Sequence, residues 1–163
     1  QELFSKIVAV EGDAFNAGVL SNSNVGNQLC DSVNVVVNCI GSIDLTESLR
    51  EAVKFNLVTA ANMIDFAQRI RHLEAFLHIS TAYVNAYRDG SFKEEESPLL
   101  PGIDAEVVLK RVMLMSENRA ESVAARIRGP YPNSHFFSKA VAEKLISQRK
   151  NNVPVVFLRP SLI

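Results

Sequence analysis

Four short apolar runs recur along the 163-residue chain and predict buried strands. They lie at residues 7–10, 33–38, 75–79 and 155–158, and Val and Ile are frequent in them. Nearly continuous apolar runs are typical of parallel strands covered on both faces, because neither side of such a strand meets water. We therefore expect four adjacent parallel strands of one sheet.

Helical periodicity fills the intervals between these runs. From residue 46 to residue 70, apolar side chains recur every three or four positions, which predicts an amphipathic helix. A second helix is expected from about Ser134 to Lys150, because a Pro-Asn-Ser segment precedes it and Pro154 follows it. Strands that alternate with such long connections predict an α/β fold with a doubly wound parallel sheet of the Rossmann type.

The interval between the third run and the second helix is longer than the other connections. Residues 87–102 are rich in charge, Gly and Pro, which predicts a loop, and residues 103–127 have a helical pattern. We expect this insertion, at about 87–130 of a partial domain spanning 1–163, to cover the active site, because long insertions between sheet strands often carry function.

Composition and charge narrow the classes of function. The chain is 47% hydrophobic and 21% charged, with a formal net charge of −1, so no nucleic-acid-binding surface is expected. No apolar run is long enough to cross a bilayer, and the three His residues lack acidic partners at ligand spacing, so we expect neither a membrane span nor a metal. Cys30 and Cys39 form no disulfide framework, which favours a reducing intracellular compartment.

The residues directly after the apolar runs are the candidates for chemistry, because ligands of open parallel sheets bind outside the carboxyl ends of the strands. The first three runs are followed by Gly12, Asp13 and Ala14, by Cys39, Ile40 and Gly41, and by Ser80 and Thr81. On the second helix, His135 and Lys139 are four residues apart and share a face. We expect Thr81, His135 and Lys139 to converge at one site.

Three motifs occur in order along the chain: Ser80-Thr81-Ala82-Tyr83-Val84-Asn85, then Lys139-Ala140 with Ala142-Glu143, and finally Leu158-Arg159-Pro160-Ser161. Together with Asn38, Gly41 and Asn56, they resemble the motifs of the fatty acyl-CoA reductases. This family belongs to the extended short-chain dehydrogenase/reductase superfamily, and the thioester-reductase domains of carboxylic acid reductases are near relatives.

The resemblance implies NADPH-dependent reduction of a long-chain fatty acyl-CoA thioester, through the aldehyde, to a fatty alcohol for lipid, wax or ether-lipid synthesis. In that mechanism a Ser or Thr and a helical Tyr bind the substrate carbonyl, and a Lys one turn later binds the nicotinamide ribose. The corresponding positions here are Thr81, His135 and Lys139. The resemblance also implies a full-length protein at the cytosolic side of a peroxisomal or endoplasmic-reticulum membrane. The cofactor contacts that it implies are Gly12, Asp13, Ala14, Cys39, Ile40, Gly41, Asn56, Ser80, Lys139, Pro160 and Ser161.

Two features depart from the family pattern. None of the seven glycines forms the phosphate loop G-x-x-G-x-x-G, and the first apolar run matches the family's third strand. We therefore expect a fragment that lacks the N-terminal βαβ unit and binds NADPH weakly. The position of the catalytic Tyr is His135. Two alternatives stay open: a non-catalytic NADP-binding pseudoenzyme, and another extended short-chain enzyme such as a nucleotide-sugar epimerase.

Overall fold

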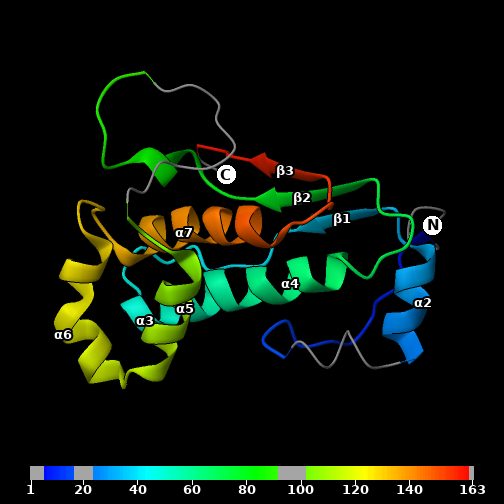
Figure 1. Cartoon of the computed structure of the whole chain (residues 1–163), viewed down its shortest axis with the longest axis horizontal. Helices are drawn as coiled ribbons and strands as arrows, with labels where there is room; N and C mark the ends of the chain where they lie inside the picture. Colours follow the sequence, from blue (N-terminus) through cyan, green and yellow to red (C-terminus); the bar gives the residue numbers. More distant parts are fainter. Residues whose placement is uncertain (1–5, 17–23, 92–101, 162–163) are drawn as a thin grey trace.

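A computed structural model describes residues 6–16, 24–91 and 102–161 of the chain (Figure 1). Its sheet has three parallel strands in the order β1 (Val35–Asn38), β2 (Ala75–Ile79) and β3 (Val155–Leu158). Asn38 of β1 is paired with His78 of β2, which is paired with Phe157 of β3. The expected α/β fold with a parallel sheet is confirmed.

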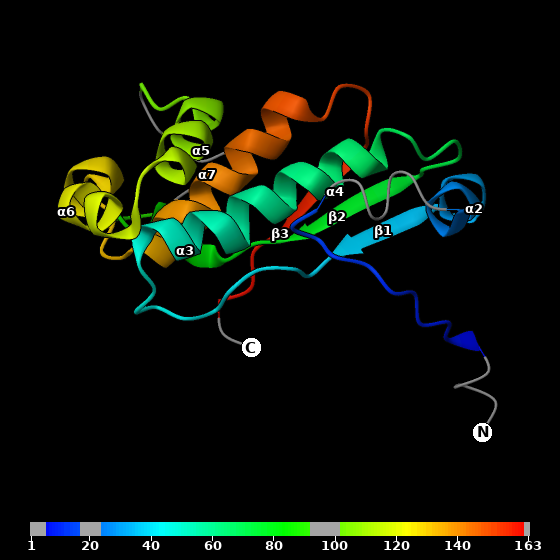
Figure 2. The ribbon, with the colours of Figure 1, turned by 90° about the horizontal axis from the view of Figure 1, so that it is seen from below.

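Two long helical segments lie side by side on one face of this sheet (Figures 1 and 2). The first consists of α3 (Leu49–Val53), the π-helix η2 (Lys54–Val58) and α4 (Thr59–Ala67), and the second is α7 (Ser134–Arg149). Ser48 begins α3 as its N-cap, accepting from the amide of Glu51 at 3.2 Å. Asn133 begins α7 in the same way, accepting from the amide of Phe136 at 2.8 Å.

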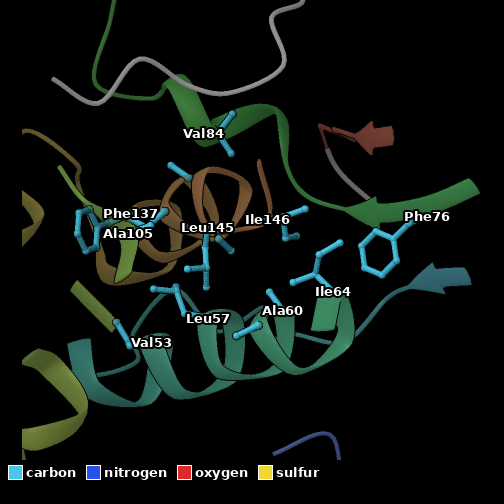
Figure 3. Packing of buried hydrophobic residues seen from close by; sticks show 14 of the residues in the cluster. Val53, Leu57, Ala60, Ile64, Phe76, Val84, Ala105, Phe137, Leu145 and Ile146 are labelled. Carbon is cyan, nitrogen blue, oxygen red and sulfur yellow. The ribbon is translucent and has the colours of Figure 1, made fainter. Parts of the chain in front are cut away.

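The hydrophobic core lies between the helices and the covered face of the sheet. Figure 3 shows Phe76 of β2 beside Ile64 of α4 and Ile146 of α7, and all three side chains are fully buried. Deeper between the helices, Leu57 and Leu145 extend the same cluster. The apolar stripe expected from residue 46 onward therefore packs on the sheet and on α7.

The opposite face of the sheet is open in the described part of the chain. Four strand residues on it are half exposed: Val35, Val37, Val156 and Leu158. The expectation that the strands are covered on both faces is therefore wrong for these residues. The strand order follows the chain order, and successive right-handed crossovers in one direction place their helices on the same side of the sheet.

The first apolar run, residues 7–10, is an extended segment outside the sheet, so the expectation of four adjacent strands is wrong for this run. Ile7 and Val8 are 66% and 81% exposed. In the Rossmann strand order 3-2-1-4-5-6, two strands separate the third strand from the fourth. A run equivalent to the third strand therefore has no neighbour to pair with in β1. Helix α2 (Asn24–Ser32) follows it, and the Cys30 carbonyl accepts from the Arg71 amide at 3.0 Å.

The described part of the insertion contains the 3₁₀-helix η3 (Ala82–Asn85) and helices α5 (Ala105–Leu114) and α6 (Glu117–Arg128). Helix α5 lies against α3, η2 and α7. Its first turn meets the end of α7, where Arg149 Nε donates to Glu106 at 2.5 Å, and after its last turn the Met115 carbonyl accepts from Arg50 Nε at 3.1 Å. Helix α5 thus packs against the helix layer, and the expectation that the insertion covers the active site stays a prediction. Residues 92–101 lie outside the described chain.

Candidate active site at the carboxyl end of the sheet

The carboxyl ends of the strands meet at one edge, as expected for three of the four predicted strand ends. The amide of Ser80 donates to the Leu158 carbonyl at 2.8 Å, and the amide of Ala82 donates to the Pro160 carbonyl at 2.9 Å. These bonds place Thr81 beside the turn of Pro160 and Ser161. The parallel pairing of β1 with β2 brings the Cys39, Ile40 and Gly41 segment to the same edge.

The predicted adenine contacts Gly12, Asp13 and Ala14 lie apart from that edge, on the flank of the first helical segment. The Ala14 carbonyl accepts from Asn62 Nδ2 at 2.8 Å, and the Phe15 ring meets the Phe55 ring edge-on at 5.2 Å. Their position beside η2 and α4 follows from residues 7–10 not being a strand of the sheet, and their contact with adenine stays a prediction.

Lys139 of α7 reaches the edge from the helix layer. Its side chain is only 7% exposed, and its Nζ donates to the Ile79 carbonyl at 3.4 Å, two residues before Thr81. Burial lowers the pKa of Lys139, and the nearby Glu143 carboxylate opposes that shift. The buried Lys139 ammonium thus lies at the carboxyl end of β2.

Gly41 comes very close to this ammonium. A Cβ on Gly41 would lie 2.8 Å from Lys139 Nζ and 2.7 Å from Asn56 Oδ1, which is closer than real Cβ atoms approach other atoms. A side chain at this position would displace the ends of the Asn56 and Lys139 side chains, and glycine lets the backbone after β1 lie against both without such a shift.

Asn56 connects three elements around the site. Its Oδ1 accepts from the Ser42 amide at 3.1 Å, and its Nδ2 donates to Ser138 Oγ at 2.9 Å. Ser138 in turn donates to the His135 carbonyl at 2.9 Å. Asn56 lies in the π-helical turn η2, and such turns occur often at functional sites. The sequence motifs indicated Asn56 but not Ser138, whose only signal was a hydroxyl next to Lys139.

The two hydroxyl residues at the end of β2 differ in their partners. Thr81 Oγ1 accepts from the Tyr83 amide at 3.3 Å and so begins η3. Ser80 Oγ is buried without a hydrogen-bond partner among the described residues. The Tyr83 ring stacks on the Phe136 ring at 5.0 Å, which fixes η3 against the first turn of α7. Both hydroxyl groups can therefore still donate a hydrogen bond to a ligand at this edge.

His135 is buried at the start of α7, with 6% of its surface exposed, and its Nδ1 has no partner within the described chain. Burial lowers the pKa of His135, and the Lys139 charge lowers it further against a smaller opposing effect of Asp44. The neutral imidazole that results has one N–H donor and one acceptor. Tyr131 offers no alternative phenol, because its hydroxyl donates to the Val84 carbonyl at 2.9 Å and burial raises its pKa.

A second histidine lies beneath the site and was expected to be a packed core residue. His78 is 1% exposed, and burial, followed by the Lys139 charge, lowers its pKa to about 3. Its Nδ1 lies 3.0 Å from Asn38 Nδ2, and Asn38 Oδ1 accepts from the Ile40 amide at 3.2 Å. Because the Asn amide is the donor, the proton of neutral His78 belongs on Nε2. This pair connects β1, β2 and the segment before Gly41.

Two further observations concern the described residues alone. They contain no group of three or more His, Cys, Asp or Glu side chains that could hold a metal ion. None of their helices is long and apolar enough to cross a membrane.

The whole chain, residues 1–163, matches the model of an NAD-binding family described as male sterility protein. It is 25% identical over 158 residues to fatty acyl-CoA reductase 1 of Xenopus laevis, covering 97% of this chain and 30% of that protein. It is 29% identical over 163 residues to a putative fatty acyl-CoA reductase of Drosophila melanogaster, covering 100% of this chain and 31% of that protein. The chain thus spans about 30% of the length of these relatives.

Two solved structures share the fold. A thiolation-reductase di-domain from an archaeal non-ribosomal peptide synthetase has a TM-score of 0.58 at 21% identity, covering 96% of this chain and 28% of that one. UDP-glucuronic acid 4-epimerase from Bacillus cereus, in complex with NAD, has a TM-score of 0.54 at 19% identity, covering 86% and 36%. At these identities the likeness shows a Rossmann-type fold.

Proposed function

Since the chain belongs to the male sterility protein family of NAD-binding domains, we propose that it is part of an NADP-dependent fatty acyl-CoA reductase. The proposed reaction takes a long-chain acyl-CoA thioester through the aldehyde to the fatty alcohol. The observation that carries the proposal is the buried Lys139 ammonium, held between the Ile79 carbonyl and Gly41 at the carboxyl edge of a parallel sheet. Relatives named fatty acyl-CoA reductase support the choice of substrate.

The residues at this edge fit a nicotinamide dinucleotide. Gly41 keeps the path beside Lys139 clear of a side chain, and Ser80 Oγ and His135 Nδ1 are buried polar atoms without partners in the described chain. When bound, the cofactor supplies the hydride. The residues that we propose to hold it are Gly12, Asp13, Ala14, Cys39, Ile40, Gly41, Asn56, Ser80, Lys139, Pro160 and Ser161.

Within this proposal, Thr81 and His135 bind the oxygen of the substrate carbonyl. A neutral imidazole is a poor proton donor in the acid–base sense, but its N–H can polarise a carbonyl as an electrophile, a role known for neutral catalytic histidines. The lowered pKa of His135 keeps the ring in that neutral form at physiological pH. Lys139 adds a positive charge that favours the developing oxyanion.

His135 also supports a second candidate function, a non-catalytic protein that binds NADP on an enzyme fold. The two functions differ in turnover but share the cofactor site. An epimerase of the same superfamily is a third possibility, but its only support is the shared fold.

The test is NADPH oxidation by the complete polypeptide that contains these 163 residues, with a long-chain acyl-CoA as substrate. Turnover that Lys139→Met abolishes, and that Lys110→Met on the exposed face of α5 leaves unchanged, is the result expected of a reductase. NADPH binding without turnover would favour the pseudoenzyme. Turnover of a nucleotide sugar in place of acyl-CoA would identify an epimerase.

The cellular location follows from the same proposal. Acyl-CoA reduction for lipid synthesis would place the full-length protein at the cytosolic side of a peroxisomal or endoplasmic-reticulum membrane. Fluorescence microscopy of the tagged full-length protein, with markers for both organelles, tests this location. A diffuse signal through the cytosol would contradict it.

A further inference from the structure

A buried ion pair connects α7 with the end of β3. Arg159 Nε donates to Glu143 Oε1 at 2.9 Å, and Arg159 Nη2 donates to Glu143 Oε2 at 2.6 Å. The Glu143 side chain is completely buried, and the Arg159 side chain is 18% exposed. Two parallel bonds of this kind fix both position and orientation, because the guanidinium and the carboxylate are each planar.

Glu143 is also one helical turn after Lys139, so the two side chains are on the same face of α7. The groups around the Lys139 ammonium are Glu143 and His135 on its own helix, Cys39 after β1 and His78 on β2. Both imidazoles have lowered pKa values and are neutral near pH 7. Two of these groups, Glu143 first and Cys39 second, oppose the lowering of the Lys139 pKa by burial, and Glu143 is the carboxylate among them.

The other end of the ion pair reaches the turn after β3. Arg159 directly precedes Pro160 and Ser161, and the Pro160 carbonyl is bonded to the Ala82 amide next to Thr81. A displacement of Arg159 would therefore move the backbone beside Thr81. One carboxylate thus acts both on the charge of Lys139 and on the position of the Pro160 turn.

We propose that Glu143 is a positioning residue of the nicotinamide site: it keeps Lys139 charged while buried and, through Arg159, holds the turn of Pro160 and Ser161 against the same ligand. The inference rests on the proposed function, because it assumes a nicotinamide dinucleotide as the ligand. A purely structural ion pair would stabilise the fold without altering how the site responds to pH.

The first test is Glu143→Gln in the complete polypeptide, with NADPH affinity measured by cofactor fluorescence between pH 6 and pH 10. Glutamine has the shape of glutamate and can still accept from Arg159, but it lacks the charge. Lys139 should then lose its proton at lower pH. We therefore expect NADPH affinity to fall at a lower pH than in the wild type, so that the alkaline limb of the affinity profile moves to lower pH.

The second variant, Arg159→Gln, should move the alkaline limb of the NADPH affinity profile to higher pH. In this variant the Glu143 carboxylate has lost its guanidinium partner. Its charge then acts on Lys139 alone, so the ammonium persists to higher pH. This variant tests the proposal even if Glu143→Gln does not fold, because general damage to the site would not extend binding to higher pH.

Glu106→Gln is the matched control, because Glu106 forms the same bidentate pair with Arg149 on the far side of the helix layer, at 2.5 and 3.0 Å. Glu106→Gln should leave the alkaline limb of the NADPH affinity profile at the wild-type pH. The inference would be overturned if NADPH affinity fell at the same pH in the wild type, Glu143→Gln and Arg159→Gln. A shift in the same direction for both variants would also overturn it. Failure of the wild type to bind NADPH would instead contradict the proposed function.

Discussion

The two ends of α7 each carry a basic side chain, but the surroundings of the two side chains differ. Near its start, Lys139 is buried and donates at 3.4 Å to a backbone carbonyl. At its end, Arg149 binds Asp65 of α4 at 2.7 Å and Glu106 of α5 at 2.5 Å. The first arrangement leaves a charge available to a ligand, whereas the second uses the charge to fix neighbouring helices.

The difference shows where stability and function are separated along one helix. Buried polar atoms without partners are costly, and proteins retain them mainly where they serve a function. At the start of α7 one such atom is His135 Nδ1, and Ser80 Oγ at the end of β2 is another; a third, Ser147 Oγ, lies in the later turns of α7. The later turns of the helix bury Leu145 and Ile146 completely. We therefore expect changes near residue 135 to affect activity more than stability, and changes near residue 145 to do the reverse.

The largest expected effect is on catalysis, from His135→Tyr in the complete polypeptide. A phenol one turn before Lys139 would donate a proton to the carbonyl oxygen more readily than a neutral imidazole, because the ammonium lowers the phenol pKa. General acid catalysis contributes about 10²–10⁴-fold in rate, and we expect a gain of roughly that size. NADPH affinity should change little.

NADPH oxidation with a long-chain acyl-CoA measures this gain, and Phe136→Tyr is its control, because residue 136 faces Tyr83 rather than Lys139. Equal rates in wild type and His135→Tyr would show that His135 or another group already acts as the donor. Inactivity of both would favour the binding protein over the enzyme.

The next effect is on stability, from Leu145→Ala in the second half of α7. Leu145 is fully buried within the cluster between the helices, and truncating a buried Leu costs about 2–5 kcal/mol because it leaves a cavity. Hydrogen exchange of peptides from α4 and α7 should accelerate accordingly. An affinity for NADPH that falls as much as stability does would contradict the separation of the two ends.

The third effect is a loss of stability in acid that comes from His78. Its folded pKa of about 3 lies below its ordinary value of 6.5, so the unfolded chain binds the proton first. The stabilising contribution is complete above pH 6.5 and is lost as the pH falls toward 3. At pH 4.5 the loss is roughly 2–3 kcal/mol for this group. His135 contributes in the same direction, because its pKa is also lowered.

Hydrogen exchange of β2 peptides at pH 7.5 and pH 4.5, corrected for intrinsic rates, measures this loss. His78→Gln keeps an acceptor for Asn38 but does not titrate, so it should remove most of the pH dependence. His72→Gln, at an exposed position before β2, should retain it. An unchanged slope in His78→Gln would show that other groups cause the acid sensitivity.

The strands and helices that depend on local pattern could be predicted from the sequence. Residues 75–79 and 155–158 are strands as predicted, and α7 ends one residue earlier than expected. The run at 7–10 has an equally good apolar pattern but is not a strand, because strand formation also requires a neighbouring strand. Pattern alone does not contain that information.

Only the candidate site residues that belong to sequence motifs could be predicted from the sequence. Lys139, Gly41 and Asn56 belong to motifs, and the structure brings these three together. The pairs Asn38 with His78 and Glu143 with Arg159 join residues 40 and 16 positions apart. Such pairs depend on strand register and helix rotation, which a single sequence does not specify.

The smallest expected effect compares the two basic residues of α7 directly. Arg149→Met removes the ion pairs with Asp65 and Glu106. The Arg149 side chain is 24% exposed, so solvent screening limits the loss of stability to about 0.5–1 kcal/mol for each pair. Lys139→Met removes a charge that is desolvated without a close carboxylate bond, and replacing such a charge with an apolar group is often neutral or stabilising. We therefore expect Lys139→Met to lower NADPH affinity but to leave hydrogen exchange of α7 unchanged or slower. Arg149→Met should accelerate hydrogen exchange at the end of α7 but leave NADPH affinity the same. If Lys139→Met accelerated exchange as much as Arg149→Met does, both ends of the helix would serve stability alike, and the cofactor role assigned to Lys139 would lose its physical basis.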